Sequence, residues 1–455
     1  MRGQAEDMMM TQRLTDMLNV YSDVQRRYFL ALFDQKDRKE TCVDLSDSDF
    51  LFFSSMSVAK RNRYLVDMRA LCRNQKLLDQ ARELRVVVLE MNAGLGTSLD
   101  IHATEGESKA TAVTFPTTIE EISILEAKFL HALRRRTDFR SFGIIPWNSE
   151  RTQKGWDRIA KKYVSQFREA EIKFYPHHLQ ADFPRLKSSS HEPLEEGREE
   201  DRFAPGGHGQ ILYHLYFSGA FKKLADEGID ILVLANSDNI SATANPFIAA
   251  FLAREKIPAV IVTTDRTDKD IKGGILALFQ EQLRLVEIGE ILPNQVGFFQ
   301  SLGLKKNHKT QPFNTNTVYI SLPVLLQFLQ SMTEDEREQY LVPKLIVNKK
   351  RVVVNGIEKE VEQLEGAIGS VVLKFPDTKL INVRVADRIS QFAPVKTNKD
   401  VEYLYQSGHF FFDLETATLK VCEKAVGGEP RAASSDAGNE ASMHSRLKRR
   451  QKSGV

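Results

Sequence analysis

Short apolar runs rich in β-branched residues alternate with amphipathic stretches through most of the chain from residue 85 onward. Such runs are typical of strands buried on both faces of a sheet, and they occur at 85–91, 142–146, 230–235, 258–263 and 318–320. Helical spacing of apolar residues between them predicts helices at 152–167, 210–227 and 246–255. This alternation predicts an α/β fold with a mainly parallel sheet covered by helices. Since ligands of such sheets bind outside the carboxyl ends of the strands, we expect the functional loops there.

The two ends of the chain have a different character from this central part. Apolar residues at helical spacing predict a helical segment over residues 1–84, with helices within 10–33 and 58–84. Residues 406–425 form a short extension after the main domain at 85–405. Residues 426–455 lack aromatics and end in a basic stretch, which predicts a disordered tail. A solvated tail is the default interpretation, and contact with nucleic acid or an acidic partner is the alternative.

The composition is typical of a protein that buries a sizeable core and handles a small ligand. Of the 455 residues, 42% are hydrophobic, and 63 basic against 61 acidic residues give a net charge of +2. This balance does not indicate nucleic-acid binding over the body of the protein. No run approaches the roughly 18 apolar residues of a membrane-spanning helix. Cys42, Cys72 and Cys422 follow no zinc or disulfide pattern, so we expect a cytoplasmic protein with reduced cysteines.

Two glycine-rich loops are candidates for close contact with a phosphate or a base. The sequence at 92–98, Asn-Ala-Gly-Leu-Gly-Thr-Ser, leaves the first predicted strand, and its glycines allow close backbone approach. A plain tight turn explains the same residues equally well. The sequence at 205–209, Pro-Gly-Gly-His-Gly, enters a predicted helix, where His208 can donate a hydrogen bond to an anion or a base. A purely structural histidine is the alternative.

A polar sequence follows the strand at 230–235 and places Asn236 and Asp238 at the carboxyl edge of the predicted sheet. A carboxylate there suits Mg²⁺ carried in with a nucleotide, whereas a helix cap or an Asx turn uses the same residue types. Other candidate segments are Lys272 to Gly274 with 284–288 as a hairpin-like return, 313–317 as amides for sugar hydroxyls, and 393–397, which carries Lys396.

A series of sequences, taken in their order, resembles the UTP–glucose-1-phosphate uridylyltransferase family over roughly residues 85–405. They are NAGLGTS, Q-x-x-x-P-R from Gln180 to Arg185, PGGHG, LANSDN, DIKGG, LRLVEI, FNTNTVYISL, LIVN, QLE and APVKT. The resemblance implies a GT-A-like nucleotidyltransferase domain with a mainly parallel mixed sheet. It also implies Mg²⁺ and the reversible formation of UDP-glucose and pyrophosphate from UTP and glucose 1-phosphate.

The resemblance also implies a role for each residue at a matching position. The positions beside uracil, ribose and the α-phosphate are Asn92, Ala93, Gly94, Gln180, Gly207, His208 and Asn236. The metal position is Asp238. The positions that line the hexose are Gly274, Glu287 and Asn316. Lys396 matches the lysine that binds phosphate across the reaction centre.

The chain departs from the family pattern after Ser98, where the family continues into a lysine-bearing stretch. Here Asp100 replaces a glycine and two glutamates intrude, so Lys109 is the expected substitute for the family's loop lysine. This altered stretch motivates the alternative of a protein that binds a nucleotide sugar without turnover. UDP-N-acetylglucosamine and broad UDP-sugar pyrophosphorylases are alternatives within the same class.

The C-terminal part differs from that of many eukaryotic relatives, which add a β-helical domain used in oligomer contacts. Few residues that we expect to be ordered follow the Lys396 segment. The sequence therefore predicts no full C-terminal β-helix domain, and it leaves the oligomeric state open.

Overall fold

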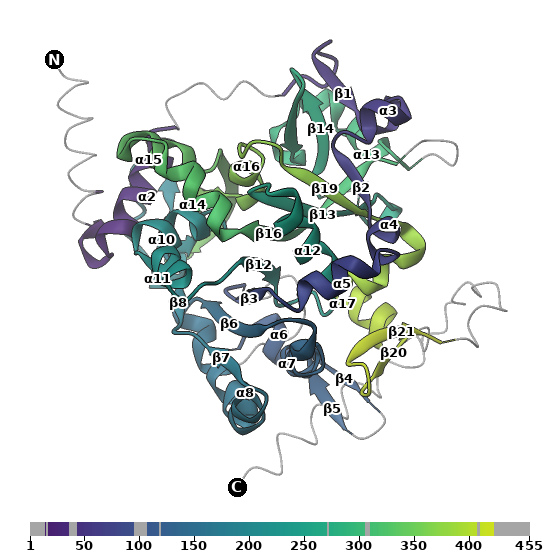
Figure 1. Ribbon diagram of the computed structural model, residues 1–455. Coiled ribbons are helices and arrows are strands. Elements are labelled where there is room, and N and C mark those ends of the chain that lie inside the picture. Colours follow the sequence, from purple (N-terminus) through teal and green to yellow (C-terminus); the bar gives the residue numbers. More distant parts are fainter. Residues whose placement is uncertain are drawn as a thin grey trace, which may run out of the picture.

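A large mixed sheet forms the centre of the computed structural model, which describes Leu14 and residues 17–35, 43–94, 107–117, 120–270, 273–304, 310–406 and 410–422. Within these residues the sheet has 12 strands, and its main path runs β2-β19-β13-β16-β12-β3-β6-β7 (Figure 1). On this path β16 is antiparallel to both neighbours, and the other pairs are parallel. The predicted α/β fold with a mainly parallel mixed sheet is thus confirmed. The strands are β2 (Leu65–Asp67), β19 (Lys379–Val383), β13 (Ala259–Asp265), β16 (Pro312–Ser321), β12 (Ile231–Asn236), β3 (Arg85–Met91), β6 (Ser141–Asn148) and β7 (Ile172–Phe174).

The strands expected from apolar runs are all present in this sheet. β3 has the predicted bounds, and β12 begins and ends one residue later than predicted. The largest difference is β16, which begins at Pro312 although only 318–320 is an uninterrupted apolar run. Its first half carries Asn314 and Asn316, and its pairing with β13 contains an irregularity between Val262 and Thr263. The first half of β16 is polar because it lies toward the carboxyl end of the neighbouring β12, where the candidate site is found.

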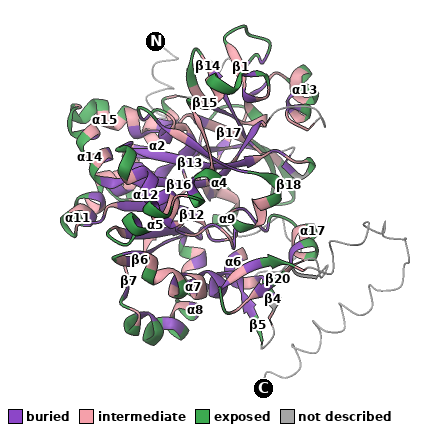
Figure 2. Cartoon of the chain, turned by 45° about the vertical axis from the view of Figure 1, so that its right-hand side comes forward, coloured by how far each residue is buried: buried purple, intermediate pink, exposed green. Residues whose placement is uncertain are grey.

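Helices cover both faces of the sheet because successive residues of each strand point to opposite sides. In β3, Val86 and Val88 join one apolar core, whereas Val87 and Leu89 join the other. In Figure 2 the buried residues follow the sheet and the exposed ones lie mainly on the outer sides of the helices. The first core includes α5 (Gln75–Ala81), α7 (Ile124–Arg135), α8 (Glu150–Glu169) and α12 (Pro246–Glu255). The second includes α2 (Asp23–Phe33), α10 (Gln210–Phe217), α14 (Leu322–Gln330) and α16 (Ile368–Val372).

Two of the predicted helical stretches are interrupted. The stretch 58–84 contains β2, which pairs in parallel with β19 and so joins the N-terminal part to the central sheet. A pattern within a short window cannot reveal a three-residue strand whose partner lies near the other end of the chain. The stretch 210–227 contains α10 and α11 (Ala220–Asp226), separated at Gly219, whose φ of +75° is left-handed.

Smaller antiparallel units surround the central sheet. The expected hairpin-like return is β14 (Ile275–Phe279) with β15 (Gln282–Val286), and β1 (Phe50–Phe52) pairs with β14. A long hairpin consists of β17 (Leu345–Val354) and β18 (Ile357–Gly366). Within the C-terminal extension, β20 (Phe410–Asp413) pairs with β21 (Thr418–Val421). Residues 423–455, which include the predicted tail, lie outside the described residues. Among the helices that are described, none combines the length and the apolar character needed to cross a membrane.

Candidate active site

The loop after β3 is held by its own polar side chains. Asn92 is 2% exposed, and its Nδ2 donates to Asn148 Oδ1 at 2.8 Å. Its Oδ1 accepts a hydrogen bond from Ser108 Oγ at 2.5 Å. A Cβ added to Gly94 would meet no other described atom within 4 Å, so packing within the described chain does not require this glycine. The glycine therefore leaves open space beside a loop whose position Asn92 fixes.

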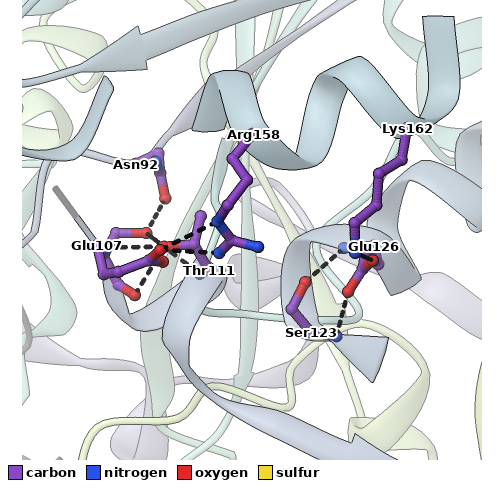
Figure 3. A network of polar contacts seen from close by, with 8 residues as sticks. Asn92, Glu107, Thr111, Ser123, Glu126, Arg158 and Lys162 are labelled. Atoms are coloured by element: carbon purple, nitrogen blue, oxygen red, sulfur yellow. Dashed lines mark hydrogen bonds and ion pairs between the residues drawn. The ribbon is translucent and has the colours of Figure 1, made fainter. Parts of the chain in front are cut away.

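The altered stretch after Ser98 is described from Glu107 onward, and residues 95–106, including Asp100, lie outside the described residues. Figure 3 shows Glu107 and Arg158 pointing toward each other, with Arg158 on α8. Glu107 Oε1 accepts hydrogen bonds from Arg158 Nε at 3.2 Å and Nη2 at 2.8 Å. Of the two intruding glutamates, Glu107 therefore has its charge compensated by Arg158 of α8. Helix α6 (Lys109–Ala112) begins directly after Ser108, which caps it by accepting a hydrogen bond from Thr111 N.

Asp238 lies in the loop after β12, next to both candidate lysine segments. Its Oδ2 is 3.4 Å from Lys109 Nζ, and the two side chains are 22% and 18% exposed. Its backbone oxygen accepts a hydrogen bond from Val395 N at 2.9 Å, which places the neighbouring Lys396 segment beside it. The structure therefore brings together three segments that are far apart in the sequence.

The chemistry of Asp238 fits a metal that arrives with a ligand. Within the described residues, no three His, Cys, Asp or Glu side chains gather to hold a metal on their own. Mg²⁺ is usually bound by one or two carboxylates together with water and substrate phosphates. A single partly exposed carboxylate beside two lysine segments is compatible with that mode of binding.

Gln180 is nearly buried, with 8% of its surface exposed, in the turn between β8 (His178–Leu179) and β9 (Asp182–Pro184). Trp147 Nε1 donates to its Oε1 at 3.4 Å, and its backbone N donates to Asn148 O at 2.6 Å. The end of β6 thus fixes Gln180, because Trp147 and Asn148 are its last two residues.

The loop around His208 packs against the end of β18. A Cβ on Gly209 would lie 2.4 Å from the carbonyl carbon of Gly366, and Gly207 has a φ of +75°. His208 Nδ1 accepts a hydrogen bond from Ile368 N at 3.1 Å. Burial lowers the pKa of His208 to about 4, so the ring is neutral near pH 7. Since Nδ1 is an acceptor in this ring, Nε2 carries the proton and can donate it to a ligand.

A cavity of about 220 Å³ unites the residues expected on the nucleotide side. All seven positions that the resemblance assigned to uracil, ribose and α-phosphate line it, together with the metal position and the expected loop lysine. Its walls are formed by Met91, Asn92, Ala93, Gly94, Ser108, Lys109, Ala110, Gln180, Gly207, His208, Asn236 and Asp238.

The residues expected on the sugar side do not line this cavity, and one of them, Asn316, contacts a residue that does. Asn316, at a left-handed φ of +60°, donates from Nδ2 to Asn236 Oδ1 at 3.2 Å. Gly274 packs against Glu287, because a Cβ on Gly274 would lie 2.4 Å from Glu287 Oε1. The exposed Lys396 lies close enough to Glu287 to favour its charged form. Asn316 therefore adjoins the nucleotide cavity through Asn236, and Gly274, Glu287 and Lys396 form a second group of neighbours.

Glu287 is a carboxyl group whose surroundings shift its pKa toward neutral pH. Burial raises its pKa to about 7, the neighbouring Glu290 acts in the same direction, and Lys396 opposes both. A carboxyl group with this pKa changes its charge near neutral pH, which suits a group that exchanges hydrogen bonds with sugar hydroxyls.

Several residues that shape the site were missed by sequence reasoning. Asn148 and Ser108 hold Asn92, and Lys128 of α7 is buried with Glu90 of β3 beside residues 236–242, which include Asp238. The one available signal was Glu90, a charged residue inside an otherwise apolar strand run. Such a charge is almost never fully buried without a partner.

Comparisons with known proteins point to one family. The model of the UTP–glucose-1-phosphate uridylyltransferase family matches residues 39–432. The UTP–glucose-1-phosphate uridylyltransferase of Saccharomyces cerevisiae is 29% identical over 348 residues, which are 76% of this chain and 64% of the yeast protein. The protein of the same name from Encephalitozoon cuniculi is 28% identical over 73% of this chain and 60% of its own length. The chain thus spans less than two thirds of the length of these curated relatives.

Solved structures with the same fold include a mutant of the UDP-glucose pyrophosphorylase from Leishmania major. It superposes with a TM-score of 0.70 at 24% identity and covers 92% of this chain and 83% of its own. Another mutant of that enzyme, solved in complex with UDP-glucose, gives a TM-score of 0.67 at 23% identity, with coverage of 92% and 83%. At this identity the likeness shows a common fold.

Proposed function

Because this chain belongs to the UTP–glucose-1-phosphate uridylyltransferase family, we propose that it forms UDP-glucose and pyrophosphate from UTP and glucose 1-phosphate. The reaction is an attack by a phosphate oxygen of the sugar on the α-phosphorus of UTP, with pyrophosphate as the leaving group. A cytoplasmic location is part of the proposal and rests on the sequence alone.

The observation that carries the proposal is the cavity beside Asp238. Its walls come from five separate segments of the chain and contain every residue expected from sequence on the nucleotide side. Its volume of about 220 Å³ suits part of a nucleotide, and Asn316 of the expected sugar side adjoins it through a hydrogen bond to Asn236.

In the proposed reaction, binding and orientation come from neutral donors and acceptors. Gln180 forms hydrogen bonds with the edge of the uracil, and the side-chain oxygen of Gln180 is held by Trp147 Nε1. His208 offers its Nε2 proton to the base or the α-phosphate, because its Nδ1 is engaged by Ile368 N. Both groups are held by the protein before the nucleotide enters, which reduces the cost of ordering them during reaction.

The two lysines offset the main electrostatic barrier to this reaction, which is the repulsion between two anionic substrates. Unit charges about 4 Å apart repel by about 4 kcal/mol at an effective dielectric constant of about 20. Lys109, beside Asp238, and Lys396, next to Val395, are on two of the segments that meet there. We assign Lys109 to the phosphates of UTP and Lys396 to phosphate across the reaction centre.

Mg²⁺ is proposed as the metal, with Asp238 as the protein residue that would hold it. A divalent ion there supplies positive charge to the phosphates when it is bound. Lys109 Nζ, at 3.4 Å from Asp238 Oδ2, keeps this carboxylate turned toward the cavity.

The hexose side is assigned to Gly274, Glu287 and Asn316. The close packing of Gly274 on Glu287 leaves the carboxyl group little freedom, so it can act as a fixed acceptor for sugar hydroxyls. A difference in one such contact changes preference between related sugars by about 1–3 kcal/mol. The choice between glucose and N-acetylglucosamine therefore depends on very few atoms.

The test is release of pyrophosphate from UTP and Mg²⁺ with a panel of sugar 1-phosphates. We expect turnover with glucose 1-phosphate and little with N-acetylglucosamine 1-phosphate or galactose 1-phosphate. Comparable turnover with several sugars would replace the glucose assignment by a broad UDP-sugar pyrophosphorylase. Binding of UDP-glucose without turnover of any sugar would overturn the enzyme proposal in favour of a non-catalytic binding protein.

A further inference from the structure

Beneath the candidate site lies a buried ion pair to which sequence reasoning assigned no role. Lys128 Nζ of α7 is 2.8 Å from Glu90 Oε2 of β3, and the two side chains are only 1% and 6% exposed. Removing two charges from water costs several kcal/mol per ion, and apolar residues of similar volume often serve stability as well or better. This pair therefore needs an explanation beyond core packing.

The remaining bonds of this pair all go to one loop, residues 236–242, here called the Asp238 loop. Lys128 Nζ donates to Ala242 O at 2.7 Å and Asn236 O at 3.0 Å, with Asn239 O further away at 3.4 Å. Glu90 Oε2 accepts a hydrogen bond from Ser237 Oγ at 3.1 Å. An ammonium group has three donors, and the three shortest contacts are to Glu90, Asn236 and Ala242. The pair thus fastens the Asp238 loop at both ends.

The opposite side of the same loop is bound by the segment that carries Lys396. Val395 N donates to Asp238 O at 2.9 Å, and Ala393 N donates to Asn239 Oδ1 at 2.8 Å. The Asp238 loop therefore lies between the buried pair on one side and the Lys396 segment on the other. Neither Glu90 nor Lys128 lines the nucleotide cavity, so the side chains of the pair act on a ligand there indirectly, and their hydrogen bonds point to the loop as the route.

We propose that Lys128 and Glu90 are positioning residues that hold the Asp238 loop in the geometry that receives the metal and the nucleotide. The inference rests on the proposed function for the identity of the ligand, but the ordering of the loop does not depend on it. Groups that orient a metal-binding residue from behind typically change metal affinity or activity by about 10–100-fold when they are removed.

The test separates positioning from stability by removing both charges together. Lys128→Met alone leaves the Glu90 carboxylate buried without its cation, and we expect a large loss of thermal stability. The double variant Glu90→Gln/Lys128→Met has no unpaired charge, so its unfolding temperature should return close to that of the wild type. Its loop carbonyls still lack a donor, and we expect its half-saturating Mg²⁺ concentration to rise by about 10–100-fold.

A second measurement is independent of turnover. In the ligand-free protein, amide hydrogen exchange of residues 237–242 should be faster in the double variant, while β3 keeps its protection. Ser237→Ala, which removes one bond without changing charge, should shift exchange in the same direction by less, and it replaces the double variant if that does not fold. The matched control is Arg27→Met/Glu338→Gln at an ion pair on α2 and α15 (Glu334–Leu341), which should leave the loop unchanged.

Wild-type Mg²⁺ dependence and wild-type loop exchange in a stable double variant would overturn the proposal and leave the pair a purely structural one. If the wild type turns over no sugar 1-phosphate, the proposed function fails, and the exchange measurement still decides whether the pair orders the loop.

Discussion

The charge and hydrogen bonding of single side chains at this site depend on the residues around them. His208 is neutral because burial lowers its pKa to about 4, and its acceptor nitrogen is fixed by Ile368 N. Lys109 reaches the same carboxylate that the sequence assigned to a metal. These details could not be predicted from the motifs, because the motif around His208 contains neither Ile368 nor any sign of the depth at which the ring lies.

Lys396→Ala should lower kcat by about 10²-fold or more, because a preorganised charge facing the reacting phosphates is lost. Lys399→Ala is the matched control, since Lys399 is also exposed and lies three residues further along the same segment. Steady-state kinetics of both variants under saturating UTP would check this expectation. Near-normal turnover of Lys396→Ala would remove Lys396 from the mechanism.

The pH dependence of kcat/KM should show the titration of Glu287. Its pKa of about 7 lies above the usual 4.5, so the charged form that accepts hydrogen bonds from the sugar appears only as the pH rises through 7. We expect kcat/KM for glucose 1-phosphate to rise over this range, and the rise to be absent in Glu287→Gln. Glu290→Gln removes a charge that raises this pKa, so it should move the inflection to lower pH.

The raised pKa of Glu287 should change stability in the direction opposite to its effect on kcat/KM. Between pH 4.5 and 7 the folded protein keeps the Glu287 proton more firmly than the unfolded chain does. The contribution of this group to the free energy of unfolding therefore falls as the pH rises through that window. Glu287→Gln should show a weaker fall in chemical denaturation series over the same range.

At the scale of elements, the apolar runs predicted the central strands well because strands buried on both faces have an unambiguous pattern. The N-terminal part was harder to predict. β2 is three residues long and acquires its strand conformation by pairing with β19, so that Leu65 lies opposite Leu380. The first half of β16 was also missed, because its polar residues serve the site and do not contribute to an apolar core.

The loop around His208 packs closely against the end of β18, and adding a single methyl group to Gly209 tests this contact. Gly209→Ala would place a Cβ 2.4 Å from the backbone of Gly366, and we expect a loss of about 1–3 kcal/mol of stability. Gly297→Ala is the control, because that exposed glycine of α13 (Val296–Ser301) has no atom within 4 Å of the added Cβ. Equal unfolding temperatures for the two variants would contradict the close packing.

At the scale of the whole molecule, the C-terminal extension is connected to a segment near the start of the central region. The hairpin β20–β21 follows the Lys396 segment, and its Phe412 packs edge-on against Phe115 with ring centroids 5.4 Å apart. Phe115 lies in β4 (Thr114–Pro116), soon after the helix that carries Lys109. The short C-terminal extension thus bridges the two lysine segments, which the sequence suggested only as an appended piece.

Phe412→Ala should therefore reduce stability by about 3–5 kcal/mol, since the ring is only 3% exposed. Phe411→Ala provides a control in the same strand, because that ring is 45% exposed, and it should change stability by no more than about 0.5 kcal/mol. Chemical denaturation of both variants measures the difference. Similar small losses in both would show that the hairpin contributes little to the fold.

The most direct test of the central claim is phosphorus NMR of a mixture of the protein, UTP, glucose 1-phosphate and Mg²⁺. We predict that the signals of the two substrates decrease together while those of UDP-glucose and pyrophosphate appear in equal amounts, and that Asp238→Asn slows this conversion strongly. Unchanged substrate signals with the wild-type protein, or conversion of UTP without formation of UDP-glucose, would contradict the account.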